Sequence, residues 1–194
     1  MMGTMSNRKK LGLLAVGIIA WIVLVIAGWI IVNALGEEEG VNLSFRVLKD
    51  SFRNGSQTIS VGYDPKLESP TYLTFNSQKE LSDAWPAFYL DRDQPPTMPS
   101  INFADEFIAL ASWGPRPNSC YATRIVSVRL KANKITCKVD HSNLEGPDVA
   151  CLGAITYPTE MVAVSKLGIV PGSYDIAFVD RQGKLLGESR VTLP

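Results

Sequence analysis

The sequence predicts a mainly β domain, a sandwich or an open barrel with one short helix, preceded by a single transmembrane helix. Three observations predict this architecture. Residues 11–32 form an apolar run long enough to cross a bilayer. Most of the chain after residue 40 alternates apolar and polar side chains with a period of two, which is typical of half-buried strands. One segment, beginning at Ser77, has the apolar spacing of a helix.

The apolar run contains 22 residues with no charged, amide or hydroxyl side chain. As a helix with a rise of about 1.5 Å per residue it spans roughly 33 Å, which covers the hydrocarbon core of a bilayer. Basic residues 8–10 precede the run and acidic residues 37–39 follow it, so the positive-inside rule places the N-terminus in the cytoplasm. We therefore divide the chain into a cytoplasmic N-terminus (1–10), a transmembrane helix (11–34), a stalk (35–40) and an extracytoplasmic β-rich domain (41–194).

A cleaved signal peptide is the alternative interpretation of the same run. Val32 and Ala34 have the spacing of the small residues that precede a signal-peptidase site. The apolar part of a secretory signal is usually about 7–15 residues, clearly shorter than this one, so the length favours an uncleaved anchor. Both interpretations export the same domain.

The first strands follow from the alternation. Residues 41–47 predict a strand with one apolar face, made of Val41, Leu43, Phe45 and Val47. Residues 59–63 and 71–75 predict the next two strands. Residues 107–113 are apolar on both faces apart from Ser112, which indicates a central strand covered on both sides.

The one predicted helix begins at Ser77. Ser77 and Glu80 have the spacing of a capping box, in which each side chain accepts a hydrogen bond from a free backbone N–H. Its apolar face follows at helical spacing: Leu81, Ala84, Trp85 and Phe88. Pro86 has no backbone N–H and crowds the preceding turn, so we expect the helix to break or kink after Trp85.

The second half of the domain reads as further strands. Residues 121–130 and 134–140 predict a hairpin, and residues 174–179 and 184–193 predict another. The segments 156–157 and 161–164 straddle Pro158, which cannot donate a ladder hydrogen bond. We therefore expect an edge position or a bulge there.

The three cysteines are predicted to form one disulfide. Outside the cytoplasm, paired cysteines tend to be oxidised. Cys120 and Cys151 each lie where a loop meets a strand, whereas Cys137 lies on the face of a strand that should point inward. We predict a Cys120–Cys151 disulfide and a buried Cys137 thiol; the alternative is three unbonded, buried cysteines.

Composition and motifs exclude several function classes. After the apolar run the chain has 16 basic and 19 acidic residues, which argues against nucleic-acid binding. The sequence has no Cys-x-x-Cys and no glycine-rich phosphate motif. The single histidine, His141, follows Asp140 without a recognisable nucleophile motif, so we interpret it as a solvated loop residue after a strand that ends at Asp140. We predict no enzyme activity, no cofactor and no metal site.

From Phe45 to about Lys166 the order of features resembles the C-terminal domain of protease complex subunit PrcB, an exported bacterial family. The most specific shared features are the Gly-Pro-Arg-Pro loop at residues 114–117 and the Thr-Tyr-Pro segment at residues 156–158. The chain departs from the family pattern at residues 118–119, in its last hairpin, and in having a membrane anchor in place of a lipid. The resemblance implies a non-catalytic subunit that associates with an exported subtilisin-like protease, and it brings no agreed binding residues.

The sequence therefore suggests a membrane-anchored accessory domain that binds another polypeptide. The contact would come from an exposed edge strand near Pro158 or from a loop. The candidate loop residues are Gly114, Pro115, Arg116, Pro117, Asn118 and Tyr121. The alternative is a small-molecule or cell-wall binding module in which Trp113, Arg116 and Tyr121 line a groove. A third hypothesis, a hydrolase that uses His141, lacks partner residues.

Overall fold

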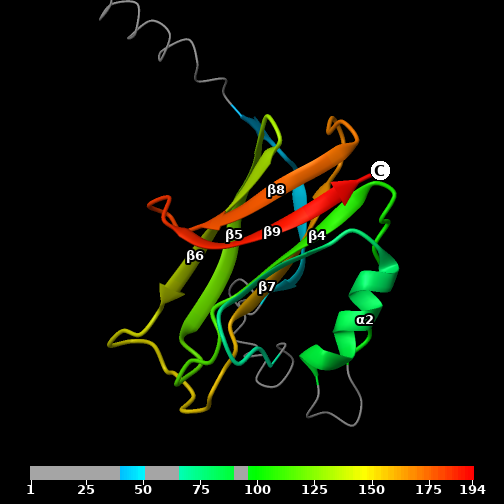
Figure 1. Ribbon diagram of the computed structural model, residues 1–194. Helices are drawn as coiled ribbons and strands as arrows, with labels where there is room; N and C mark the ends of the chain where they lie inside the picture. The colour runs from blue at the N-terminus through cyan, green and yellow to red at the C-terminus, as the bar shows by residue number, and fades with distance from the viewer. Residues whose placement is uncertain (1–39, 51–65, 90–95) are drawn as a thin grey trace, which may run out of the picture. The chain divides into compact units, whose positions relative to one another are not determined.

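The computed structural model describes residues 40–50, 66–89 and 96–194, which belong to one compact unit, Gly40–Pro194 (Figure 1). The predicted cytoplasmic N-terminus, the transmembrane helix and the strand at 59–63 lie outside the described residues. Within the described part of the chain, no helix is long and apolar enough to span a membrane.

Nine strands in two sheets and one helix make up the described residues, so the mainly β class with one short helix is confirmed. The five-stranded sheet has the spatial order β1 (Val41–Asn42), β5 (Tyr121–Lys131), β6 (Lys134–Asn143), β8 (Gly172–Val179) and β9 (Leu185–Leu193). The four-stranded sheet has the order β2 (Phe45–Asp50), β7 (Thr159–Ser165), β4 (Glu106–Ser112) and β3 (Thr71–Phe75). Neighbouring strands are antiparallel except β6 and β8, which are parallel.

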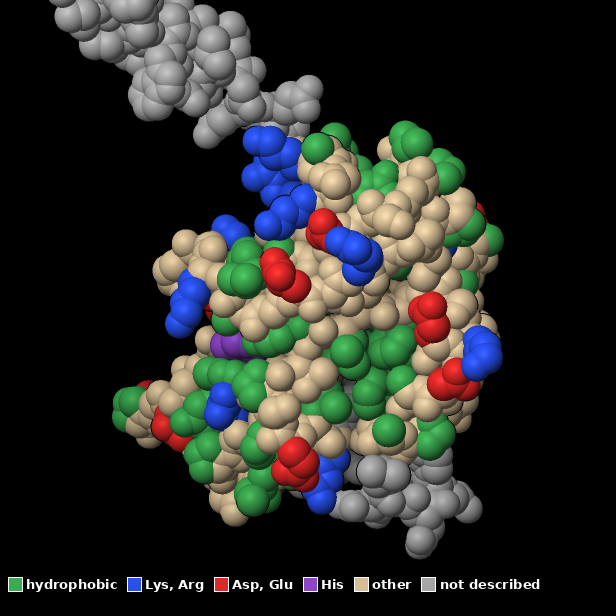
Figure 2. All heavy atoms as spheres, viewed as in Figure 1, with side chains coloured by type: hydrophobic (Ala, Val, Ile, Leu, Met, Phe, Trp, Pro, Cys, Tyr) green, Lys and Arg blue, Asp and Glu red, His purple; other side chains and the backbone are tan. Residues whose placement is uncertain are grey.

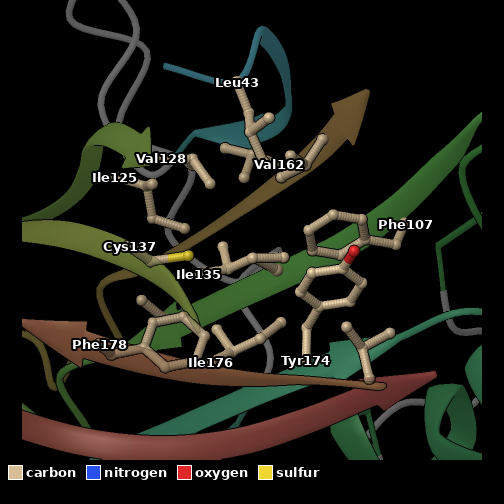
Figure 3. Close-up of a cluster of buried hydrophobic side chains, with 14 of the residues drawn as sticks. Leu43, Phe107, Ile125, Val128, Ile135, Cys137, Val162, Tyr174, Ile176 and Phe178 are labelled. Carbon is tan, nitrogen blue, oxygen red and sulfur yellow. The ribbon is translucent and has the colours of Figure 1, made fainter. Parts of the chain in front are cut away.

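The inner faces of the two sheets share one hydrophobic core (Figure 3). In the longer strands the inward-facing residues largely alternate with outward-facing ones, as the pattern predicts. The four-stranded sheet contributes Phe107 and Val162, and the five-stranded sheet contributes Ile135 and Phe178. Cys137 lies in this core as the predicted buried free thiol, and burial raises its pKa to about 12.

β4 is covered on both faces, as predicted. Phe107 and Ala109 face the inter-sheet core, while Ile108 and Leu110 face a second apolar cluster that includes the helix α2 (Gln78–Phe88). Ser77 caps this helix, because its side chain accepts a hydrogen bond from the backbone N–H of Glu80 at 3.2 Å. The Glu80 carboxylate accepts from the N–H of Asn76 at 2.7 Å, one residue before the position that a capping box uses.

We expected the helix to break or kink after Trp85, and the expectation of a break is wrong. α2 includes Pro86 and continues to Phe88. Pro86 lies in the last turn, where the missing N–H removes only one helical hydrogen bond. Trp85 and Phe88 on either side of it are both buried in the second cluster, and this packing keeps the last turn helical.

The prediction of one strand over residues 41–47 is also wrong. β1 pairs with β5 in one sheet, whereas β2 pairs with β7 in the other. The chain changes sheets at Leu43, whose side chain is buried in the inter-sheet core. Val41 and Val47, expected on the same face as Leu43, are exposed. Alternation alone does not reveal that a strand changes its partner.

Pro158 does not mark an edge strand. β7 begins at Thr159, just after the proline, and lies inside its sheet between β2 and β4. At this position a proline removes no ladder hydrogen bond, and its carbonyl oxygen accepts from the N–H of Trp113 and from the Thr123 hydroxyl, both at 3.0 Å. β7 therefore offers no free edge for strand addition.

β3 and β9, the edge strands of the two sheets, close one side of the sandwich against each other. The Thr74 and Ser189 hydroxyls are 2.7 Å apart across this junction. At Gly187 the β9 backbone lies directly against the Tyr72 ring, so an added Cβ would be only 2.5 Å from Tyr72 Cδ2. The glycine is needed for this close approach.

We expect Gly187→Ala to lower the free energy of unfolding by about 1–3 kcal/mol, because the new methyl group overpacks the junction and displaces Tyr72. Gly153→Ala is the matched control, since a Cβ there meets nothing within 4 Å. Urea unfolding of both variants measures the difference. Equal midpoints for the two variants would show that the junction is not tightly packed.

Candidate functional site

Two loops meet at one end of the sandwich, which we call the disulfide end: residues 113–121 and 144–158. They leave the ends of β4 and β6 and lead into the starts of β5 and β7, so four strand ends position them (Figure 1). Cys120 and Cys151 join the loops as a disulfide with a Cα–Cα distance of 5.4 Å, which confirms the predicted pairing.

Backbone hydrogen bonds tie the same two loops together. Arg116 and Thr156 exchange a pair of them, with N–O distances of 2.8 and 3.0 Å. The N–H of Ser119 donates to the carbonyl of Leu152 at 3.1 Å. With the disulfide, these contacts hold the two loops together as one surface.

The buried polar residues of the described domain gather beneath these loops. They are Ser112, Thr123, Thr159 and Glu160. The Thr159 hydroxyl donates its proton to the Tyr157 carbonyl at 2.9 Å and accepts from the Ser112 hydroxyl at 3.0 Å, which joins β7 to β4. The Glu160 carboxylate accepts the N–H of Ile125, at the bulge that interrupts the β5–β6 ladder. Hydrogen bonds thus hold the strand ends under the loops in fixed positions.

Three large apolar side chains are exposed on the second loop. Val149, Leu152 and Ile155 are 46%, 48% and 67% exposed. Sequence reasoning missed them, because isolated apolar residues in a loop carry no periodic signal. The available hint was their spacing every three residues between two prolines, Pro147 and Pro158.

Trp113, Arg116 and Tyr121, which the sequence suggested as a groove, do lie together. The Arg116 guanidinium lies over the Trp113 ring, 4.3 Å from its centre, and donates to the Trp113 carbonyl at 2.9 Å. The Arg116 Nε is buried with no hydrogen-bond partner among the described residues. Tyr121 contacts Trp113 edge to face, with ring centres 5.4 Å apart. The three side chains therefore contact one another.

The other candidate loop residues have different surroundings. Gly114 is buried and has a φ of 73°, and a Cβ at this position would be 2.9 Å from the backbone of Ser69. The fold therefore requires glycine here. Asn118 accepts from the N–H of Cys120 at 2.9 Å and donates to the Glu145 carboxylate. Pro115 is half-buried and Pro117 is exposed.

His141 is not the solvated loop residue that we expected. It lies within β6, which continues past Asp140 to Asn143, and its ring stacks on Trp113 with centres 4.7 Å apart. Figure 2 shows this single histidine at the surface, bordered by hydrophobic side chains. Burial lowers the pKa of His141 to about 4, and the positive charge of Arg116 acts in the same direction.

Both ring nitrogens of His141 form hydrogen bonds with hydroxyl groups. The Thr123 hydroxyl donates its one proton to the Pro158 carbonyl, so Nδ1 of His141 donates to Thr123 Oγ1 at 3.1 Å. Nε2 then accepts from the Tyr72 hydroxyl at 3.0 Å. This arrangement requires the neutral imidazole. Asp140, the neighbouring acid, pairs with Arg181 at 2.6 Å.

No protein-family model, curated protein or solved structure matches the chain. Among the described residues, no group of three or more histidine, cysteine or acidic side chains is arranged to hold a metal ion.

We predict that the single histidine titrates with a midpoint near pH 4 in the folded protein, against about 6.5 for an exposed histidine. The unfolded chain takes up this proton between those values and the folded chain does not. The contribution of His141 to stability is therefore complete above about pH 6.5 and is lost as the pH falls towards 4. The NMR titration of the ring protons measures the midpoint; a value near 6.5 would contradict the neutral network.

We predict that reduction of the disulfide lowers the free energy of unfolding by roughly 3–4 kcal/mol, because it closes a separation of 31 residues. Urea unfolding with and without a reductant measures this loss. The double variant Cys120→Ala/Cys151→Ala is the control and should not respond to the reductant. An unchanged midpoint for the reduced wild-type chain would show that the bond is absent or contributes nothing.

Proposed function

We propose that this chain is a membrane-anchored, extracytoplasmic, non-catalytic domain that binds another exported polypeptide through its disulfide end. The observation that carries the proposal is the exposure of Val149, Leu152 and Ile155 on loops that a disulfide and backbone hydrogen bonds hold together. The partner contact is loop docking, because the edge strand expected near Pro158 is an inner strand.

The composition of the surface favours a protein partner. Exposed apolar side chains gathered at one place mark interaction sites more often than single ones do. Trp, Tyr and Arg are enriched where proteins bind each other, and Trp113, Tyr121 and Arg116 belong to the same pair of loops. Loops that are already fixed lose little conformational entropy on binding, which leaves more of the apolar contact energy for affinity.

The position of the disulfide end suits a partner in the extracytoplasmic space. Tyr121 at this end and Lys131 near Gly40 are the two ends of β5. A strand of 11 residues covers about 33 Å, at about 3.3 Å per residue. The disulfide end therefore lies at the opposite end of β5 from Gly40, where the preceding chain enters the domain.

The anchor and the kind of partner come from the sequence. The apolar run at residues 11–32 and its flanking charges support a single-pass anchor with the N-terminus in the cytoplasm. The disulfide suits an oxidising compartment. The resemblance to PrcB supports an exported protease as the partner and an accessory, non-catalytic part for this chain.

A small-molecule or cell-wall binding module is the second candidate, because Trp113, Arg116 and Tyr121 lie together as it requires. Their contacts with one another and with His141 leave less of each surface for a ligand. A melting temperature that rises in the presence of cell-wall fragments, with no protein partner recovered, would favour this candidate.

Site-specific photo-crosslinking in native membranes tests the main proposal. A photoreactive amino acid replaces Leu152 in the full-length chain, and the crosslinked product is identified by mass spectrometry. We expect one dominant exported protein. Val126, a similarly exposed side chain on β5, is the control position and should give no such product.

The double variant Leu152→Ser/Ile155→Ser measures the energy of the contact. We expect at least a tenfold loss of co-purified partner with an unchanged melting temperature, since truncating central apolar contacts typically costs more than about 1.4 kcal/mol. Equal crosslinking from positions 152 and 126, or full recovery of the partner with the double variant, would overturn the proposal.

A further inference from the structure

The opposite end of the sandwich has its own exposed apolar loop. This Gly40 end consists of Gly40, the β5–β6 turn (131–134) and residues 166–171 between β7 and β8 (Figure 1). Leu167 and Val170 in the loop are 89% and 71% exposed, the highest values among the large apolar side chains of the described residues.

Hydrogen bonds and packing hold this loop in place, so the exposure of Leu167 and Val170 is a property of the fold. The N–H of Ile169 donates to the Lys166 carbonyl at 2.9 Å, and the Tyr174 hydroxyl donates to the Val170 carbonyl at 2.6 Å. Ile169 packs against the inter-sheet core. Because Ile169 is held inward, Leu167 and Val170, which precede and follow it in the loop, are exposed to solvent.

The three parts of the Gly40 end lie side by side. Val41 pairs with Leu130 at the end of β5, and the Arg129 guanidinium donates to the Gly40 carbonyl at 3.3 Å. The turn connects to the start of β8, because the N–H of Asp175 donates to the Asn133 carbonyl at 3.1 Å. The chain therefore enters the domain at the same end as Leu167 and Val170, which lie in the loop that leads into β8.

The length of the preceding chain limits how far this end can be from a bilayer. Seven residues, 33–39, separate Val32, the last residue of the apolar run, from Gly40, so eight Cα–Cα steps connect the two. Fully extended, they reach no more than about 28 Å, of which the headgroup region takes up about 6–7 Å. The Gly40 end therefore lies within about 28 Å of the end of the apolar run.

The charges of the Gly40 end are compatible with anionic headgroups. Arg129, Lys131 and Lys134 are exposed cations here, and Figure 2 shows Lys and Arg side chains gathered at this end. The carboxylates of Asp175 and Glu106 are paired with Arg190 at 2.6 Å and Arg46 at 2.8 Å. Because Asp105 is exposed nearby and acidic residues 37–39 precede Gly40, we assign the contact mainly to the apolar loop.

We infer that the Gly40 end lies on the outer surface of the bilayer, with Leu167 and Val170 inserted among the lipid headgroups. The inference rests on the anchor in the proposed function. It adds a fixed orientation, in which the sandwich stands upright on the membrane and presents the disulfide end to the partner.

Fluorescence quenching by spin-labelled lipid tests this orientation in the full-length chain, reconstituted into phosphatylethanolamine–phosphatidylglycerol vesicles. An environment-sensitive dye is attached to Leu167→Cys; the native cysteines are bonded or buried and do not compete. Leu185→Cys on β9, 51% exposed and outside the Gly40 end, is the matched control. We expect blue-shifted emission and at least threefold stronger quenching at position 167 than at position 185.

Alkaline carbonate extraction separates the two levels of the hypothesis. A chain that stays in the vesicles while positions 167 and 185 are quenched equally would overturn the orientation and leave the anchor intact. Release of the chain by carbonate would overturn both, since the short tether would be lost. A blue shift of the dye at position 167 in native membranes but not in protein-free vesicles would show that a protein covers the loop. This result would also overturn the inference.

Discussion

The structure depends on one constraint, the burial of both faces of the β4–β7 pair. One face of these strands meets the five-stranded sheet and the other meets a cluster that includes α2, so neither strand can shift its register without exposing apolar side chains. Because β4 and β7 are fixed, the loops that leave the end of β4 and enter the start of β7 are fixed too. The position of the candidate site is a consequence of core packing.

The polar contacts at the disulfide end follow from that position. Where strands end, the apolar alternation gives way to hydroxyl and carboxylate groups that must find partners once buried. The Thr123 hydroxyl forms hydrogen bonds with both the Pro158 carbonyl and the His141 ring, and the Glu160 carboxylate accepts a hydrogen bond at the bulge in β5. Burial lowers the pKa of His141 and keeps its ring neutral, and the ring stacks on Trp113. The contacts at the strand ends therefore hold the loops of the site in place, while the apolar side chains on the second loop are exposed.

The sequence was informative wherever one local property decided the outcome. A continuous apolar run identified the covered strand β4, alternation identified the β5–β6 hairpin, and the places where cysteines meet strands identified the disulfide. It was uninformative where the partner in space decides. The change of sheet at Leu43, the inner position of β7 and the stacking of His141 on Trp113 all depend on strands distant in sequence. The exposed apolar residues of the second loop belong to no helix or strand pattern, so their positions in the fold identify them more clearly than their spacing does.

The covalent topology of the disulfide has a consequence for cleavage of the domain by a protease. Cys120 precedes β5 and Cys151 follows β6, so the bond encloses the whole β5–β6 hairpin in a covalent ring. The exposed segment from Gly146 to Ala150 lies inside that ring. Cleavage there produces two polypeptides that remain linked through sulfur, and the strands on both sides of the cut stay paired. A nick in the most accessible part of this loop therefore leaves the domain assembled.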